Sequence, residues 1–177
     1  MTTSVSNAFP DGAWIAVQVR CGFEASVSKG LYERGYEEFL PSYRDPERRR
    51  AIERPLFPGY VFCRYARFPT HRIVEVPSVI RLVGIGKVPL AIPDGEIDDI
   101  RRVVDSGVYS EPWKFLHAGQ HVIVTRGPIK GVRGKLVAEK KGMRLIVSVN
   151  LLGRAIAIEV DAADVRPETI LDTLVVH

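Results

Sequence analysis

The fold is decided by residues 126–160, RGPIKGVRGKLVAEKKGMRLIVSVNLLGRAIAIEV. Apolar and polar side chains alternate along much of this stretch, which is typical of antiparallel strands with one buried face. Glycines interrupt the alternation where a small barrel has to turn sharply, at Gly127, Gly131, Gly134, Gly142 and Gly153. We expect an all-β module of about five strands. Its predicted core consists of Val122, Val124, Val132, Leu136, Ile146, Val147 and Val149.

The composition is that of an ordinary globular protein. The 177 residues are 46% hydrophobic and 26% charged, and no apolar run approaches the roughly 20 residues that span a membrane. Residues 1–13 lack the basic start and apolar centre of a signal peptide, so we expect a disordered tail over residues 1–12 and a cytoplasmic protein without membrane contact. The net charge of +4 permits nucleic-acid binding but does not argue for it.

The first part of the chain predicts an α+β domain. Alternating or aromatic-rich strands are expected at residues 14–20, 38–44, 56–65 and 79–85, and helices at 23–36, 70–76 and 94–106. Asp94 is the expected N-cap of the last helix, and Gly107 its stop. This order predicts helices packed on an antiparallel sheet. We therefore place one domain at residues 13–108, a linker at 109–118 and the β-rich domain at 119–170.

A catalytic site is hard to assemble from these residues. None of the four histidines pairs with a serine or cysteine in a nucleophile motif, and GIGK at residues 84–87 lacks the rest of a phosphate loop. The acidic residues at 94–99 fall in the first turns of a helix, where they complement its dipole. Cys21 and Cys63 show no zinc-site spacing and are expected to pack as reduced thiols. We expect a binding protein rather than an enzyme, with no cofactor and no metal.

Motifs in both parts resemble the NusG family of bacterial transcription factors. HVIVTRGPIKGVRGKLV at residues 121–137 and MRLIVSVNLLGRAIAIEVDAADV at 143–165 are similar to its KOW domain. WxxVQ from Trp14, FPGYV at residues 57–61, PxVxxxVG at 77–84 and the segment 90–93 before an acidic helix are similar to its N-terminal domain. The motifs occur in the family's order over about residues 14 to 167. The resemblance implies a ferredoxin-like domain followed by an SH3-like barrel.

The resemblance also implies a partner for the first domain, the clamp helices of the largest subunit of RNA polymerase. It places Phe57 and Tyr60 at or near the contact surface, together with Trp14 and Val79. The alternative for Phe57 and Tyr60 is that they are core residues. Binding would suppress pausing or termination. The basic residues Arg48, Arg49 and Arg50 and the helix start Thr70, His71 and Arg72 would then lie near upstream or non-template DNA or the opposite polymerase jaw. The alternative for residues 44–54 is a solvated hairpin tip.

For the second domain, the resemblance implies recruitment of a ribosomal protein or of the termination factor Rho. The implied contact residues are Ile129, Leu151, Leu152 and Arg154. Ile129 and Leu152 stand where the housekeeping protein has aromatic residues, which favours a specialised antitermination paralogue. The β-branched residues of this domain disfavour a helical refolding. Two other functions remain open: a ribosome-associated or RNA-binding KOW protein, and an enzyme with Cys21 or Cys63 as its nucleophile.

Overall fold

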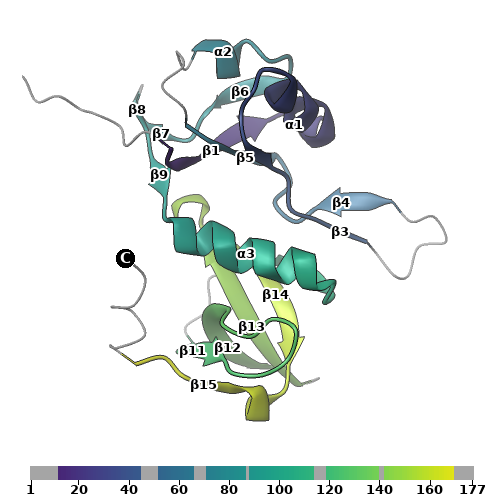
Figure 1. The fold of residues 1–177 in the computed structure, drawn as a ribbon, viewed down its shortest axis with the longest axis vertical. Helices are drawn as coiled ribbons and strands as arrows, with labels where there is room; N and C mark the ends of the chain where they lie inside the picture. Colours follow the sequence, from purple (N-terminus) through teal and green to yellow (C-terminus); the bar gives the residue numbers. More distant parts are fainter. Residues whose placement is uncertain are drawn as a thin grey trace, which may run out of the picture. The chain divides into compact units, whose positions relative to one another are not determined.

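The computed structural model describes residues 12–44, 52–65, 71–86, 88–113, 119–139 and 142–169 (Figure 1). It divides into two compact units. The N-terminal unit consists of residues 1–40 and 59–93, and the C-terminal unit of residues 41–58 and 94–177. This division cuts the chain ahead of the helix that begins at Asp94, whereas the sequence-based boundary follows that helix. The predicted domain boundaries therefore stay a prediction.

The N-terminal unit is built on a five-stranded antiparallel sheet with the strand order β2-β5-β1-β6, in which β9 also pairs with β1. Its elements are β1 (Trp14–Val19), α1 (Glu24–Glu33), β2 (Glu38–Phe39), β5 (Tyr60–Arg64), α2 (His71–Val74), β6 (Val79–Leu82), β7 (Gly84–Ile85), β8 (Val88–Pro89) and β9 (Ala91–Ile92). Ile15, Val17 and Val19 on β1 point to one face and pack with Val27 and Leu31 of α1. This packing follows from the two-residue period of a strand and the helical spacing of the apolar residues in α1.

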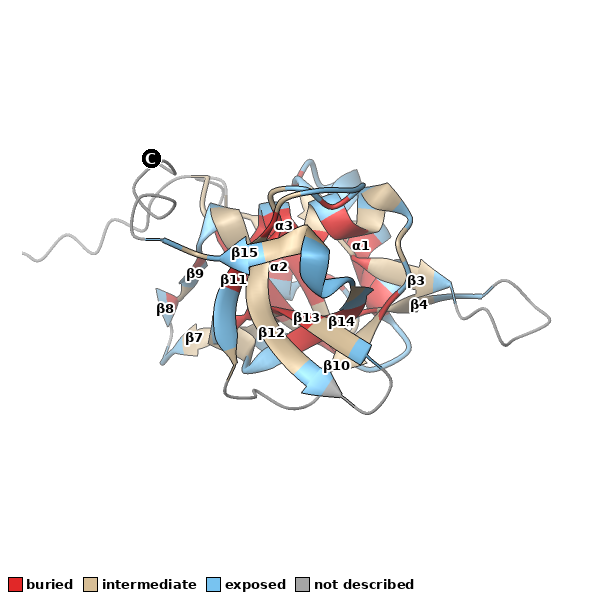
Figure 2. Cartoon of the chain, turned by 90° about the horizontal axis from the view of Figure 1, so that it is seen from below, coloured by how far each residue is buried: buried red, intermediate tan, exposed pale blue. Residues whose placement is uncertain are grey.

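The C-terminal unit contains a six-stranded antiparallel sheet with the order β10-β14-β13-β12-β11-β15. Its elements are β3 (Ser42–Arg44), β4 (Glu53–Pro55), α3 (Asp94–Ser106), β10 (Ser110–Trp113), β11 (Gln120–Val124), β12 (Arg133–Glu139), β13 (Gly142–Val149), η1 (Asn150–Leu152), β14 (Arg154–Val160), η2 (Ala162–Asp164) and β15 (Val165–Pro167). The helix α3 packs against β13 (Figure 1). Figure 2 shows the buried positions of this sheet concentrated on β13 and β14.

The mixed class with antiparallel sheets is confirmed, and most of the predicted C-terminal core is buried. Leu136 is the exception, because it is only partly buried. Within the described ranges, no strand pairing joins β10 to β15, so a closed SH3-like barrel remains a prediction. Gly107 ends α3 with a φ of +70°, as the sequence predicts.

Several sequence-based elements differ from the structure. The strand predicted at residues 38–44 is divided into β2 and β3, and the strand predicted at 79–85 is divided into β6 and β7, with the two parts of each in different sheets. The strand predicted at residues 56–65 begins only at Tyr60, because Pro58 and Gly59 form a turn in which Gly59 has a φ of +84°. The segment predicted as a linker contains β10, which pairs with β14 from Ser110 opposite Ile158 onward. Residues 1–11 of the predicted tail and 114–118 of the predicted linker lie outside the described residues.

Candidate functional site

The FPG turn before β5 carries the first predicted contact surface. Tyr60 begins β5 at the end of this turn and is partly exposed. Gly59 joins the turn to β1, because its carbonyl oxygen accepts a hydrogen bond of 2.9 Å from the backbone N–H of Val19. Its own N–H donates to a carboxylate oxygen of Glu24 at 2.8 Å. The turn is therefore held by hydrogen bonds to both the N–H and the carbonyl oxygen of Gly59.

The four residues predicted to contact polymerase divide by exposure. Trp14 and Phe57 are fully buried, whereas Tyr60 and Val79 are partly exposed. The ring of Trp14 meets Phe39 edge-on at 6.5 Å between centroids, and the guanidinium of Arg64 lies 4.9 Å from its centroid. A polymerase contact by these four residues stays a prediction, and Trp14 and Phe57 have to become accessible before they can make it.

The predicted nucleic-acid or jaw residues lie largely outside the described part of the chain. Arg48, Arg49, Arg50 and Thr70 are not described, and of His71 only the backbone is, at the start of α2. Arg72 is exposed. The flanks of the basic tip pair as an antiparallel hairpin, with β3 opposite β4.

The second predicted contact surface is the turn from β13 to β14, which we call the recruitment turn (residues 150–154). It consists of η1, Gly153 with a φ of +58°, and Arg154, which pairs with Val149 across the two strands. Leu151 and Leu152 are partly exposed, and Arg154 is exposed. Ile129 is buried in the C-terminal unit, so its side chain supports the sheet rather than forming a free surface in this conformation.

The helix α3 contacts the recruitment turn through Glu96. One carboxylate oxygen accepts a bond of 2.7 Å from Nδ2 of Asn150, and the other accepts the backbone N–H of Asn150 at 3.2 Å. Partial burial raises the pKa of Glu96, and the two bonds from Asn150 act against that rise. The sequence explains this acid by the helix dipole alone and gives no sign of its contact with a turn 54 residues later.

A second acid of α3, Asp99, is buried against the sheet. Its carboxylate lies 3.4 Å from Nη1 of Arg102 and accepts a hydrogen bond from the backbone of Arg133. Burial raises the pKa of Asp99 to about 6, because desolvation outweighs these favourable contacts. Sequence reasoning missed this residue, since only the docking of α3 on the sheet shows which face of the acidic segment is dry.

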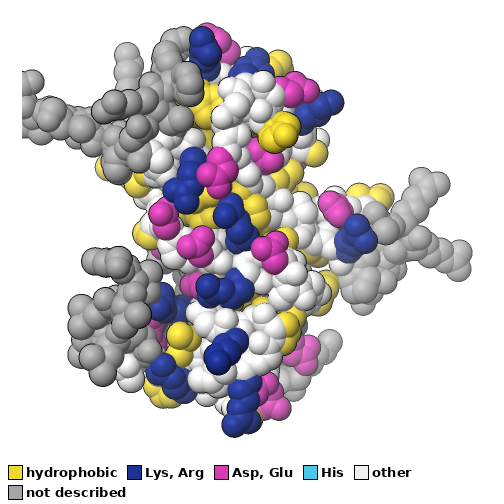
Figure 3. All heavy atoms as spheres, in the orientation of Figure 1, with side chains coloured by type: hydrophobic (Ala, Val, Ile, Leu, Met, Phe, Trp, Pro, Cys, Tyr) yellow, Lys and Arg dark blue, Asp and Glu magenta, His cyan; other side chains and the backbone are white. Residues whose placement is uncertain are grey.

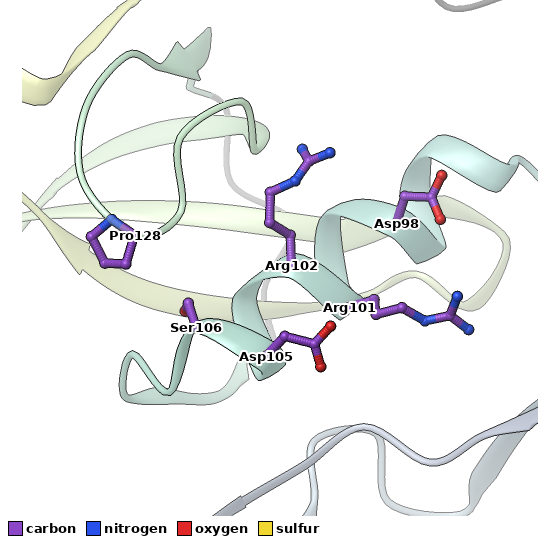
Figure 4. A pocket seen from close by; sticks show the side chains of 6 residues that line it. All are labelled: Asp98, Arg101, Arg102, Asp105, Ser106 and Pro128. Atoms are coloured by element: carbon purple, nitrogen blue, oxygen red, sulfur yellow. The ribbon is translucent and has the colours of Figure 1, made fainter.

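The outer side of α3 is polar. Figure 4 shows Arg102 extending toward the loop that carries Pro128, while Arg101 points away from that loop. Figure 3 shows Lys and Arg side chains interspersed with Asp and Glu over the C-terminal unit, without one continuous basic patch on the visible face. The described residues on this face therefore do not form the continuous basic surface that phosphate backbones select.

A metal site and a thiol nucleophile each place requirements on the described residues. They contain no group of three or more His, Cys, Asp or Glu that could hold a metal ion. Burial, reinforced by Glu38, raises the pKa of Cys63 to about 12, so this thiol is a poor nucleophile at neutral pH. Cys21 is exposed. No helix in the described ranges is long and apolar enough to cross a membrane.

Comparison with known proteins gives one consistent family. The family model NusG, described as transcription termination factor nusG, matches residues 12–101. The proteins named transcription termination/antitermination protein NusG from Yersinia pestis and Escherichia coli K12 are each 30% identical over 175 residues, covering 89% of this chain and 97% of the relative. The solved structure described as domain interaction in Thermotoga maritima NusG covers 90% of this chain and 98% of its own, with a TM-score of 0.57 and 20% identity. The chain belongs to the NusG family.

Proposed function

We propose that this chain is a transcription factor that acts on elongating RNA polymerase and modulates termination or antitermination. The observation that carries this proposal is the 30% identity to proteins of that name along nearly their whole length. In this proposal the N-terminal unit binds the clamp helices of the polymerase largest subunit and suppresses pausing. The C-terminal unit recruits a second factor, for which a ribosomal protein and Rho are the candidates.

Tyr60 is the polymerase anchor that we favour in the N-terminal unit. It is an aromatic residue at the surface, and it follows a turn whose backbone is hydrogen-bonded on both sides. A rigid aromatic side chain provides a large contact area at a small cost in conformational entropy, which is why tyrosines recur as interface anchors. Val79 is also partly exposed and adds apolar area.

The recruitment turn combines two partly exposed leucines with the exposed Arg154. Such a surface suits a partner with an apolar segment next to an acidic residue. Because Leu152 supplies an aliphatic rather than an aromatic contact, we expect weaker binding than an aromatic anchor gives, in keeping with a specialised paralogue.

The proposal is tested by measuring the affinity of the full chain for bacterial RNA polymerase. Tyr60→Ala is expected to weaken binding about tenfold, because truncating an interface aromatic typically costs more than ~1 kcal/mol. The matched control is Tyr32→Ala, which removes a tyrosine that is 72% exposed on α1 of the same unit. A wild-type chain without measurable polymerase affinity refutes the proposal, and equal losses in the two variants refute the anchor.

The division of roles is tested with Leu152→Asp combined with Arg154→Ala. We expect this variant to lose its second factor while polymerase affinity is unchanged. An RNA-binding protein would instead bind RNA alone, with an affinity that falls steeply as salt rises. Loss of polymerase binding in the double variant contradicts the assigned division.

A further inference from the structure

Glu24 is a buried acid that binds two backbone groups far apart in the sequence. Only 5% of the residue is exposed. One carboxylate oxygen accepts the N–H of Gly22 at 2.7 Å, and the other accepts the N–H of Gly59 at 2.8 Å. Gly59 lies 35 residues later, in the FPG turn that ends at Tyr60. One side chain therefore joins the start of α1 to the turn that carries the proposed polymerase anchor.

Gly59 is constrained by its hydrogen bonds and its backbone conformation rather than by crowding. Gly59 has a φ of +84°, and its carbonyl oxygen accepts the N–H of Val19 at the end of β1. A Cβ added at Gly59 would lie 3.4 Å from Sγ of Cys21. The carboxylate of Glu24 and the backbone of Val19 thus hold the same residue by its donor and by its acceptor.

The charge of Glu24 matters as well as its shape. Within the described residues, no Lys or Arg forms an ion pair with it, so the two N–H groups and the N-terminus of α1, where it is the first residue, compensate its charge. A carboxylate is an acceptor at both oxygens. Glutamine has the same length but presents an NH₂ group at one of them, and two donors would then face each other at Gly22 or at Gly59.

We infer that Glu24 is a positioning residue for polymerase binding, which fixes the FPG turn and thereby the direction of Tyr60. This inference rests on the function proposed above. Glu24 does not need to touch the polymerase. Its carboxylate determines where the aromatic anchor lies before the complex forms, so that less conformational freedom is lost on binding.

A merely structural role of Glu24 gives a different expectation, which a control on the same helix separates. Ser28 is buried on α1, and its hydroxyl donates to a carboxylate oxygen of Glu38, away from the FPG turn. Ser28→Ala therefore removes a partly buried hydrogen bond from the same helix without touching Gly59. If Glu24 contributes stability alone, both variants bind polymerase like wild type well below their melting temperatures.

The experiment compares wild type, Glu24→Gln, Ser28→Ala, Tyr60→Ala and the pair Glu24→Gln with Tyr60→Ala as full chains. The affinity for RNA polymerase is measured together with the amide proton shifts of Gly22 and Gly59. We expect Glu24→Gln to bind about tenfold more weakly, with at least one of the two amide protons moving upfield. Ser28→Ala is expected to bind like wild type. In the Tyr60→Ala background, Glu24→Gln should cost little further affinity, because residues that act as one unit are not additive.

The outcomes separate the inference from the function on which it rests. A wild-type chain that does not bind polymerase refutes the proposed function. If wild type binds and Glu24→Gln binds equally well, or if its loss adds fully to that of Tyr60→Ala, the inference on Glu24 is overturned. Should Glu24→Gln fail to fold, Glu24→Asp takes its place; it keeps the charge but is one methylene too short to reach both N–H groups, and the same results decide.

Discussion

Replacement of Asp99 by asparagine is expected to stabilise the C-terminal unit at neutral pH and to have little effect in acid. Asp99 is only 8% exposed, and its burial raises the pKa from 3.8 to about 6. Asparagine has the same shape and keeps an oxygen that accepts the N–H of Arg133, but it carries no charge into the dry contact. Arg102 loses an ion-pair partner, at little cost because its side chain is 46% exposed.

The magnitude follows from the difference between the two pKa values. A change of one pKa unit corresponds to about 1.36 kcal/mol, so the rise in the pKa of Asp99 from 3.8 to about 6 corresponds to at most about 3 kcal/mol in the free energy of unfolding. The folded-state pKa lies above the unfolded value, so the stability that this carboxyl contributes is fully present below pH 3.8 and is lost as the pH rises through about 6. The free energies of unfolding of variant and wild type should therefore coincide near pH 3.5 and differ by about 1 to 3 kcal/mol at pH 7.5.

The difference in free energy of unfolding is measured by urea unfolding from pH 3.5 to pH 8. Unfolding is followed by the fluorescence of Trp113, which lies on β10 in the six-stranded sheet of the C-terminal unit. Trp14→Phe in every protein compared removes the signal of the N-terminal unit. Asp105→Asn is the matched control, because Asp105 is an exposed acid on the same helix that does not contribute to the pKa shift of Asp99; its replacement should leave the free energy of unfolding close to that of wild type. A difference that is constant over this pH range, or a wild type that is the more stable at pH 7.5, refutes the reasoning.

Two further comparisons test the packing of glycine and cysteine positions. Gly134→Ala should destabilise the C-terminal unit by about 3 kcal/mol, because the added Cβ would lie 2.5 Å from the carbonyl oxygen of Ile146. Gly127→Ala should cost only about 1 kcal/mol in the same urea unfolding, because an added Cβ meets open space there and only the φ of +80° is unfavourable. Iodoacetamide at pH 8 should alkylate the exposed Cys21 well before Cys63, because Cys63 is buried and burial raises its pKa to about 12. The two rates are measured by mass spectrometry of peptides, and equal rates would contradict the burial of Cys63.

The strands in which apolar and polar side chains alternate strongly could be predicted from the sequence, because this alternation is visible in the local sequence and shows which side chains share the buried face. The predicted core valines of β11, β13 and the turn before β12 are buried for this reason. The strand β10 was missed because SEPW contains a proline and two polar residues. Pro112 is tolerated there, since among the described strands β10 lies at the edge of its sheet and pairs with β14 alone.

The candidate contact surfaces likewise have features that the sequence predicts and features that it does not. Gly153 of the recruitment turn adopts a positive φ and is one of the glycines at which the sequence predicts a turn, whereas the turn at Gly59 falls inside a segment predicted as a strand. The burial of Trp14 and Phe57 could not be predicted, because it depends on which other segments cover each side chain, and the local sequence does not contain that information.

Three acids near helix N-termini share a contact that their sequence positions do not reveal. Glu24, Glu96 and Asp99 all lie in the first two turns of a helix, and each accepts a backbone N–H from another segment: Gly59, Asn150 and Arg133 respectively. The helix N-terminus lowers the cost of holding a carboxylate in a partly dry place, and the carboxylate in turn fixes the segment whose N–H it accepts. For Glu24 and Glu96 this segment is a predicted contact turn, and for Asp99 it is the start of β12. Acidic residues that offset the basic charge of this chain are therefore used in part to position the two predicted contact turns.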